Sequence, residues 1–293
     1  MKLIHFMKKI ILLFIFTLYD AQALEVNVGT GTFDWNVEIP RIYTSYKTLD
    51  IYTLDISEQH YNLDNSRFYL FGNINFYKST IQTQKEQPTA NQTIFDLIGI
   101  KIDLLATLND IFDNALPISS KYKVNGVDGD IGVGYEIISN DKGYIGAGVT
   151  FGMAFPFLKD TSTVQLFSKG TNTEVSTYKF GLSLQSRYNL TQNFSFYSTI
   201  ISAYQIGNST NPSFKSSLDM KGIYYFINGG LEISPDENSE FSNFYMHLGF
   251  IAKNWDVTEI SFSIAGIKAN DISSLLKNNL FSNYVYWGLG YHF

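Results

Sequence analysis

The stretch "GYIGAGVTFGMAFPFL", residues 143–158, alternates large apolar side chains with small ones. Its odd positions, from Ile145 to Phe157, are Ile, Ala, Val, Phe and Met, whereas the even positions from Gly146 to Ala154 are Gly, Thr and Ala. Successive side chains of a β-strand point to opposite faces of the sheet, so this period predicts a strand with one apolar face and one narrow face. The stretch is also much longer than the roughly five or six residues of an ordinary globular strand.

Seven further segments show the same alternation, and short polar connections between them alternate with long ones. Two weaker candidate strands within residues 24–65 would bring the count to ten. The alternative is a barrel of eight strands with residues 24–65 as an extension, and the full range is eight to twelve. This pattern predicts an all-β fold, a transmembrane antiparallel up-and-down β-barrel with short turns at one rim and long loops at the other. The seven segments are residues 66–78, 126–139, 177–190, 193–208, 218–234, 241–264 and 283–293.

The composition places the apolar faces of these strands in lipid. Charged residues make up 16% of the chain, and aromatic residues make up another 16%; an ordinary soluble domain has about 25% charged residues. A lipocalin-like barrel or a sandwich in water would need a charged outer face, and the polar faces here are mostly Gly, Ser, Thr, Asn and Tyr. In lipid every backbone polar group must be paired within the protein, so a sheet must close on itself.

One segment departs from the strand period. In residues 93–114 the apolar side chains recur at helical spacing. We expect an amphipathic helix in the first long loop, folded into or across the mouth of the barrel.

The amino terminus has the organisation of a secretory signal peptide. Basic residues precede the apolar run at residues 10–19, and Ala21-Gln22-Ala23 gives the small-x-small pattern of a cleavage site. We therefore expect a signal peptide at residues 1–23 and one outer-membrane barrel domain at residues 24–293. The chain has no cysteine and a formal net charge of −6, which argues against disulfides, Cys-based metal sites and a nucleic-acid partner.

The last residues, "NYVYWGLGYHF" at 283–293, keep the alternation to the end of the chain. They resemble the carboxy-terminal assembly signal of bacterial outer-membrane barrels, in which a polar residue and a glycine precede two alternating hydrophobic residues, the last being a terminal aromatic. The matching positions are Tyr286, Gly288, Tyr291 and Phe293. The resemblance implies an outer-membrane location with both termini periplasmic. The partners it implies are the barrel assembly machinery, periplasmic chaperones, and outer-membrane lipid with lipopolysaccharide.

The inward parity of the strands carries charges of both signs. Opposite charges inside a narrow barrel usually pair, whereas the many inward glycines leave room for a narrow path or for the helix at 93–114 as a plug. No pattern predicts a metal site, a cofactor or a catalytic constellation, so we expect no enzymatic activity. The residues expected to line the lumen are Asp128, Asp130, Glu136, Lys179, Arg187, Glu232, Arg67 and His247.

Two functions are consistent with such a barrel. The first is a narrow pore or facilitator for small solutes. The alternative is a structural or surface-interaction barrel, adhesin-like, without transport activity. The sequence names no solute, and it does not separate these two functions.

Overall fold

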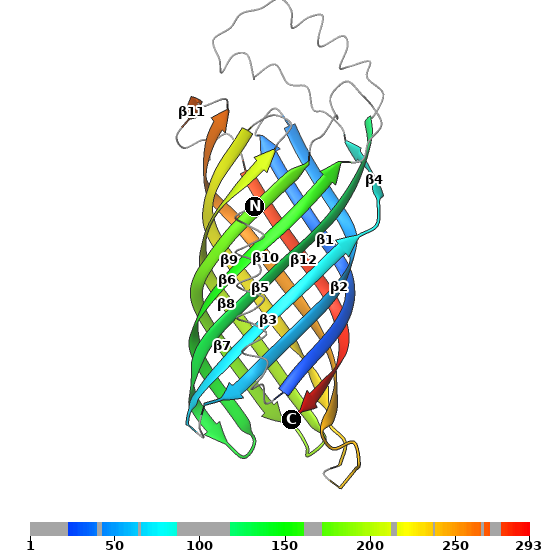
Figure 1. The fold of residues 1–293 in the computed structure, drawn as a ribbon, viewed down its shortest axis with the longest axis vertical. Helices are drawn as coiled ribbons and strands as arrows, with labels where there is room; N and C mark the ends of the chain where they lie inside the picture. Colours follow the sequence, from blue (N-terminus) through cyan, green and yellow to red (C-terminus); the bar gives the residue numbers. More distant parts are fainter. Residues whose placement is uncertain are drawn as a thin grey trace, which may run out of the picture.

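The computed structural model shows a single sheet that closes into a barrel (Figure 1). Each long strand pairs antiparallel with the next along the chain, and β12 pairs with both β10 and β1 to close the sheet. The predicted fold class, a closed antiparallel β-barrel, and the preferred count of ten strands are both confirmed. The residues that the structure describes are 23–39, 43–63, 66–86, 118–160, 172–211, 216–236, 238–264, 267–269 and 277–293.

Ten long strands form the wall, and two short ones, β4 and β11, extend the sheet at one rim by pairing with β5 and β10. The strands are β1 (Ala23–Ile39), β2 (Tyr43–Asn62), β3 (Phe68–Ser79), β4 (Gln82–Glu86), β5 (Ile118–Asn140), β6 (Gly143–Asp160), β7 (Thr173–Asn189), β8 (Phe194–Asn211), β9 (Ser216–Ile233), β10 (Phe244–Ile264), β11 (Ile267–Ala269) and β12 (Lys277–His292).

The two ends of the barrel differ. We call the rim where β1 begins and β12 ends, at the bottom of Figure 1, the terminal rim, and the opposite one the loop rim. At the terminal rim Ala23 pairs with His292, and a tight turn leads from β5 to Gly143, whose φ of 134° is one that L side chains rarely adopt. The described residues contain no helix long and apolar enough to cross a membrane. The helix expected at 93–114 and the signal peptide expected at the amino terminus lie outside the described residues, apart from Ala23.

An apolar band covers the outside of the barrel from the terminal rim upward. On β12, for example, Val285, Trp287 and Leu289 point outward and are about half exposed, because lipid rather than protein is their neighbour. The band covers about ten residues of most strands, which matches the roughly 25 Å apolar belt and the tilted strands of outer-membrane barrels. Charged outward residues such as Asp34 and Lys78 follow where the band ends toward the loop rim.

The polarity of the two faces reverses beyond this band. On β1 and β2 the inward side chains there are Phe33 and Leu49, both fully buried, while Asp34 and Asp50 face outward. The loop-rim part of the barrel therefore resembles a soluble barrel, with a charged exterior and an apolar core. This reversal explains why several strands are longer than expected, since β5 begins at residue 118 rather than at 126. The core comprises Phe33, Trp35, Leu49, Ile51, Tyr77, Tyr122, Val124, Ala154, Leu158, Val175, Met220, Trp255 and Leu280, among others.

Candidate functional site in the barrel lumen

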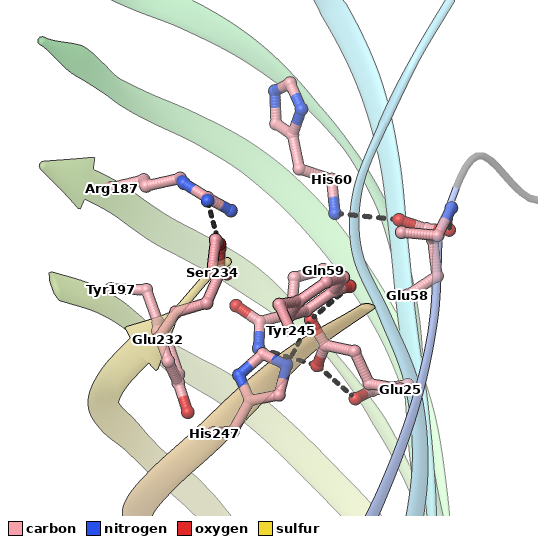
Figure 2. A network of polar contacts seen from close by, with 12 residues as sticks. Glu25, Glu58, Gln59, His60, Arg187, Tyr197, Glu232, Ser234, Tyr245 and His247 are labelled. Carbon is pink, nitrogen blue, oxygen red and sulfur yellow. Dashed lines mark hydrogen bonds and ion pairs between the residues drawn. The ribbon is translucent and has the colours of Figure 1, made fainter. Parts of the chain in front are cut away.

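A cluster of polar side chains fills the lumen at the terminal rim (Figure 2). Its centre is Glu25 on β1, which accepts hydrogen bonds from Ser57 Oγ at 2.9 Å and from Gln59 Nε2 at 2.7 Å. Tyr245 and His247 approach the same carboxylate from β10, with His247 Nε2 at 3.5 Å from Glu25 Oε1. Only alternation along each strand is needed to aim these side chains inward, because β1, β2 and β10 each contribute every second residue.

One ion pair and one histidine–carboxylate contact also belong to this cluster. The Arg187 guanidinium contacts the Glu232 carboxylate, which also accepts a hydrogen bond from Ser234 Oγ at 3.2 Å. His60 Nε2 lies 2.9 Å from Glu136 Oε1. We call the full set the rim cluster: Glu25, Ser57, Gln59, His60, Glu136, Arg187, Glu232, Ser234, Tyr245 and His247.

Two buried ion pairs lie in the middle of the lumen. Lys179 Nζ lies 2.9 and 3.0 Å from the two carboxylate oxygens of Asp130, and Lys253 Nζ lies 2.7 Å from Asp128 Oδ1. All four side chains are at most 1% exposed. Lys179 Nζ also stands 3.9 Å from the ring centre of Tyr224, within cation–π range. We call these four charged residues the central ion pairs.

Tyrosine hydroxyl groups connect strands that are not direct neighbours in the sheet. Tyr284 donates to Asp55 Oδ1 at 3.0 Å. Tyr286 donates to Asn228 Oδ1 at 2.7 Å, and Tyr197 donates in turn to Tyr286 at 2.5 Å. Because Tyr197 and Tyr286 lie on β8 and β12, these bonds stabilise the cross-section of the barrel as well as individual strand pairs.

Aromatic rings occupy the space above the inward glycines. A Cβ atom added at Gly134 would collide with the ring of Tyr69, and one at Gly132 would collide with Phe71. Gly290 is covered in the same way by Tyr245. The room that these glycines suggested in the sequence is therefore filled by rings that reach over from neighbouring strands.

Two small cavities lie in the described part of the lumen. The larger polar one, of about 30 Å³, lies between the rim cluster and the central ion pairs and is lined by residues such as Asp55, Gln185 and Tyr286. An apolar one of about 10 Å³ lies beside Met220 and Trp255 in the loop-rim core. A cavity needs roughly 10–15 Å³ by this measure to hold one water, so the polar cavity has room for two or three.

The structure places seven of the eight residues expected to line the lumen inside the barrel. They are divided between the rim cluster and the central ion pairs. Arg67 differs, because it precedes β3 at the terminal rim and is exposed. Sequence reasoning missed Lys253, Glu25 and Asp55, although the inward parity of β10, β1 and β2 would have included all three. The seven residues inside are Asp128, Asp130, Glu136, Lys179, Arg187, Glu232 and His247.

The four residues of the carboxy-terminal pattern occupy both faces of β12. Tyr286 is 2% exposed in the lumen, and Gly288 pairs with Asn27 of β1. Tyr291 points outward, and its ring lies 4.8 Å from that of Phe244 and 5.1 Å from that of Phe293. Phe293 is 75% exposed. The terminal strand thus presents an aromatic group at the edge of the apolar band.

The described histidines, His60, His247 and His292, all lie at the terminal rim. His60 packs between the rings of Tyr69 and Tyr144, at 4.6 and 4.3 Å. Within the described ranges no group of three or more His, Cys, Asp or Glu side chains is arranged to hold a metal ion. Their surroundings are those of packed, polar lumen residues.

Comparison with known proteins finds similarity in structure alone. No family model and no curated protein matches the sequence. The outer membrane protease OmpT from Escherichia coli shares 8% identity over 94% of this chain and 98% of its own, with a TM-score of 0.47. The Pseudomonas putida toluene transporter TodX and the translocator domain of the autotransporter NalP from Neisseria meningitidis each share 10% identity over 94% of this chain and 90% of theirs, with TM-scores of 0.32 and 0.35.

Structural similarity at this level does not allow an activity to be inferred for this chain. The class of the protein follows from the outer surface of its own barrel. A closed sheet with an apolar outer band is one of the two structures that can span a bilayer. The chain is an integral outer-membrane β-barrel. The comparison does not choose between the two functions expected from the sequence.

Proposed function

We propose that the lumen of this barrel is closed at rest, and that the protein acts through the surface it presents outside the membrane. The observation that carries the proposal is the loop-rim core. Trp255, Leu280 and Phe33 are each at most 3% exposed and meet in the lumen, with the ring centres of Phe33 and Trp255 at 6.2 Å. Buried apolar side chains that meet at this level of the lumen oppose a water-filled path through it, which supports a closed lumen.

The orientation of the barrel belongs to this proposal. The terminal rim, with its short turns and both ends of the described barrel, would face the periplasm, and the loop rim would face outward. The exposed Phe293 at the terminal rim supports this, because the assembly machinery would reach it from the periplasmic side. An epitope tag inserted at Asp141, in the turn between β5 and β6, should be hidden in intact cells and accessible after permeabilisation; accessibility in intact cells would overturn the orientation.

A narrow pore or facilitator for small solutes is the second candidate. The polar side chains of the lumen favour it, since they occur in the rim cluster, around the polar cavity and in the central ion pairs. Apolar side chains such as Phe71, Phe226 and Ile251 also line the polar cavity, and the loop-rim core lies beyond the central ion pairs. In this second function, the core would be a gate rather than a permanent closure.

Single-channel conductance in planar bilayers separates the two candidates. For the surface barrel we expect the folded full-length chain to be silent, and Trp255→Ala with Phe33→Ala to raise current by removing the core. Leu182→Ala, on the lipid-facing side of β7, is the matched control and should stay silent. Steady unitary currents from the unchanged chain would overturn the closed lumen and establish the pore.

No catalytic role is part of this proposal. The described histidines are packed against tyrosine rings at the terminal rim, whereas the loop-rim lumen is lined by apolar side chains. An acid–base pair for hydrolysis needs a polar group within hydrogen-bond reach of a substrate. Assays of peptide and lipid ester hydrolysis by the folded chain should therefore give rates at background.

A further inference from the structure

Four lysines lie together on the outer wall just beyond the apolar band. Lys78 is on β3, Lys121 and Lys123 are on β5, and Lys159 is on β6. Strand register places Lys123 directly opposite Lys159 and places Lys78 opposite Asn125, two residues from Lys123. All four point outward, and three of them are exposed, Lys123 being half-buried. We call these residues the lysine patch.

Two lysines of the patch, Lys123 and Lys159, face each other across a strand pair with like charge. Like charges directly opposite on one face of a sheet destabilise the strand pair, yet the described residues provide no ion pair to Lys78, Lys123 or Lys159. Asp50 and Glu174, both outward, flank the patch on β2 and β7, diagonal to Lys78 and Lys159. An anion that bridges the opposed lysines would remove the repulsion.

The surroundings of the patch suit an amphiphilic anion. Directly below Lys78, toward the apolar band, is Phe76, which is 43% exposed, and Val127 and Phe155 continue the apolar surface onto β5 and β6. The barrel wall is also asymmetric at this level, because β1 and β10 carry Asp34 and Asp256 outward. A ligand with negative head groups and apolar chains would match the lysine side of the wall and not the opposite side.

We propose that the lysine patch binds the phosphate groups of a phosphorylated glycolipid of the outer leaflet, lipopolysaccharide, with its acyl chains lying on Phe76, Val127 and Phe155. This rests on the orientation given under Proposed function, since the loop rim must lie in the outer leaflet. The lysines lie just beyond the apolar band, which is the level at which the phosphates of such a lipid would border its hydrocarbon chains. Basic groups near an anionic membrane surface attract it even without fixed geometry.

The test compares Lys78→Gln/Lys123→Gln/Lys159→Gln with Lys221→Gln in the full-length folded chain. Lys221 is a matched control, because it also points outward beyond the band but is already paired with Glu259, at 2.8 Å. The hydrogen bond and charge of Glu259 raise the pKa of Lys221 above its usual value, so it remains charged. Both proteins are placed in neutral lipid nanodiscs that contain diphosphorylated lipid A, lipid A stripped of its phosphates, or neither, with inorganic phosphate alone as a fourth condition.

We expect the triple variant to bind diphosphorylated lipid A about tenfold more weakly or worse, and Lys221→Gln to bind it as the unchanged chain does. The melting temperature gives a second readout, in which the triple substitution has opposite effects in neutral lipid and in lipid that contains diphosphorylated lipid A. In neutral lipid the triple variant should melt at the same temperature as the unchanged chain or higher, since repulsion is relieved, whereas only the unchanged chain and Lys221→Gln should gain stability from diphosphorylated lipid A.

Three results would overturn the lipid site. Equal stabilisation by dephosphorylated lipid A would assign binding to the acyl chains, and equal stabilisation by inorganic phosphate would indicate a general anion site. Equal loss of binding in Lys221→Gln would show that net charge, not the patch, is responsible. None of these outcomes bears on the closed lumen, which is tested by conductance, or on the orientation, which is tested by the Asp141 tag.

Discussion

Replacing Lys179 with Met should strongly destabilise the barrel, because it removes one partner of a buried ion pair. Asp130, which has almost no exposure to water, would lose its contacts of 2.9 and 3.0 Å and remain as a buried carboxyl group without a partner. Breaking a buried pair in this way costs about 3–5 kcal/mol. The cation–π contact with Tyr224 at 3.9 Å is lost as well, although Met packs favourably against aromatic rings and recovers part of it. We therefore expect about 3–5 kcal/mol in total.

The pair can be separated from its surroundings by a double-mutant cycle. Asp130→Asn alone should cost a similar amount, because it leaves the Lys179 ammonium buried and unpaired. The double variant Lys179→Met/Asp130→Asn carries no charge at this site, so its cost should be only about 1–2 kcal/mol, far below the sum of the two single changes. Such strong coupling is the signature of a buried pair.

Urea unfolding in detergent micelles measures these free energies. Tryptophan fluorescence follows the loop-rim core, where Trp35 and Trp255 are buried, and the mobility of unboiled samples on gels reports closure of the barrel. The control is Lys221→Met, which breaks the exposed pair with Glu259, where both side chains are more than half exposed, and should change stability far less than Lys179→Met. If Lys179→Met costs no more than Lys221→Met, or if the single costs simply add, the central pairs do not contribute as argued.

Three further changes test other parts of the barrel. Phe293→Asp should slow assembly and leave periplasmic protein, seen by cell fractionation, whereas Asn283→Asp, outward on the same strand beyond the apolar band, should assemble normally. Gly134→Val should overpack the ring of Tyr69 and cost about 1–3 kcal/mol in urea titrations; Tyr69→Ala should recover part of this, and no recovery would mean that the ring is not the obstacle. Leu182→Arg, in the middle of the apolar band, should cost about 2–4 kcal/mol in folding into lipid vesicles, and a neutral result would place β7 outside the bilayer.

Strand number and facing could be predicted because they depend on local alternation. The alternation can be seen within each strand by itself. The neighbours of Asp128 and Lys179 along the chain therefore show that both side chains lie on the inward face. The choice of ionic partner does not follow from local alternation. Lys253 and Asp128 are 125 residues apart, and they meet only because β5 and β10 lie across the lumen at matching heights. Strand register and barrel shear determine those heights, and the alternation within a strand contains no information about either.

The filling of the lumen was unpredictable for the same reason. The inward glycines indicated free space in the lumen. From the sequence, this space was expected to hold either a path for solutes or a helix. The structure fills this space with rings such as Tyr69 over Gly134 and Tyr245 over Gly290. A ring and the glycine it covers are neighbours across strands rather than along the chain. The segment 93–114 lies outside the described residues, so the expected helix stays a prediction.

The reversal of polarity along the barrel has a physical consequence for how the protein sits in the membrane. Alternation has a period of two whichever face is apolar, so the sequence pattern continues unbroken where the exterior changes from lipid to water. On the outside, Asp34, Asp50 and Lys78 mark that change, and on the inside Phe33 and Leu49 begin the core at the same level. If the barrel moved so that the bilayer covered these charges, each would cost from roughly 1 kcal/mol near the interface to about 2–4 kcal/mol at the midplane.

Movement of the barrel in the opposite direction would expose apolar residues at the loop-rim end of the band, such as Phe76, to water. The two polarity patterns together therefore hold the barrel at one depth, with its apolar core outside the hydrocarbon layer.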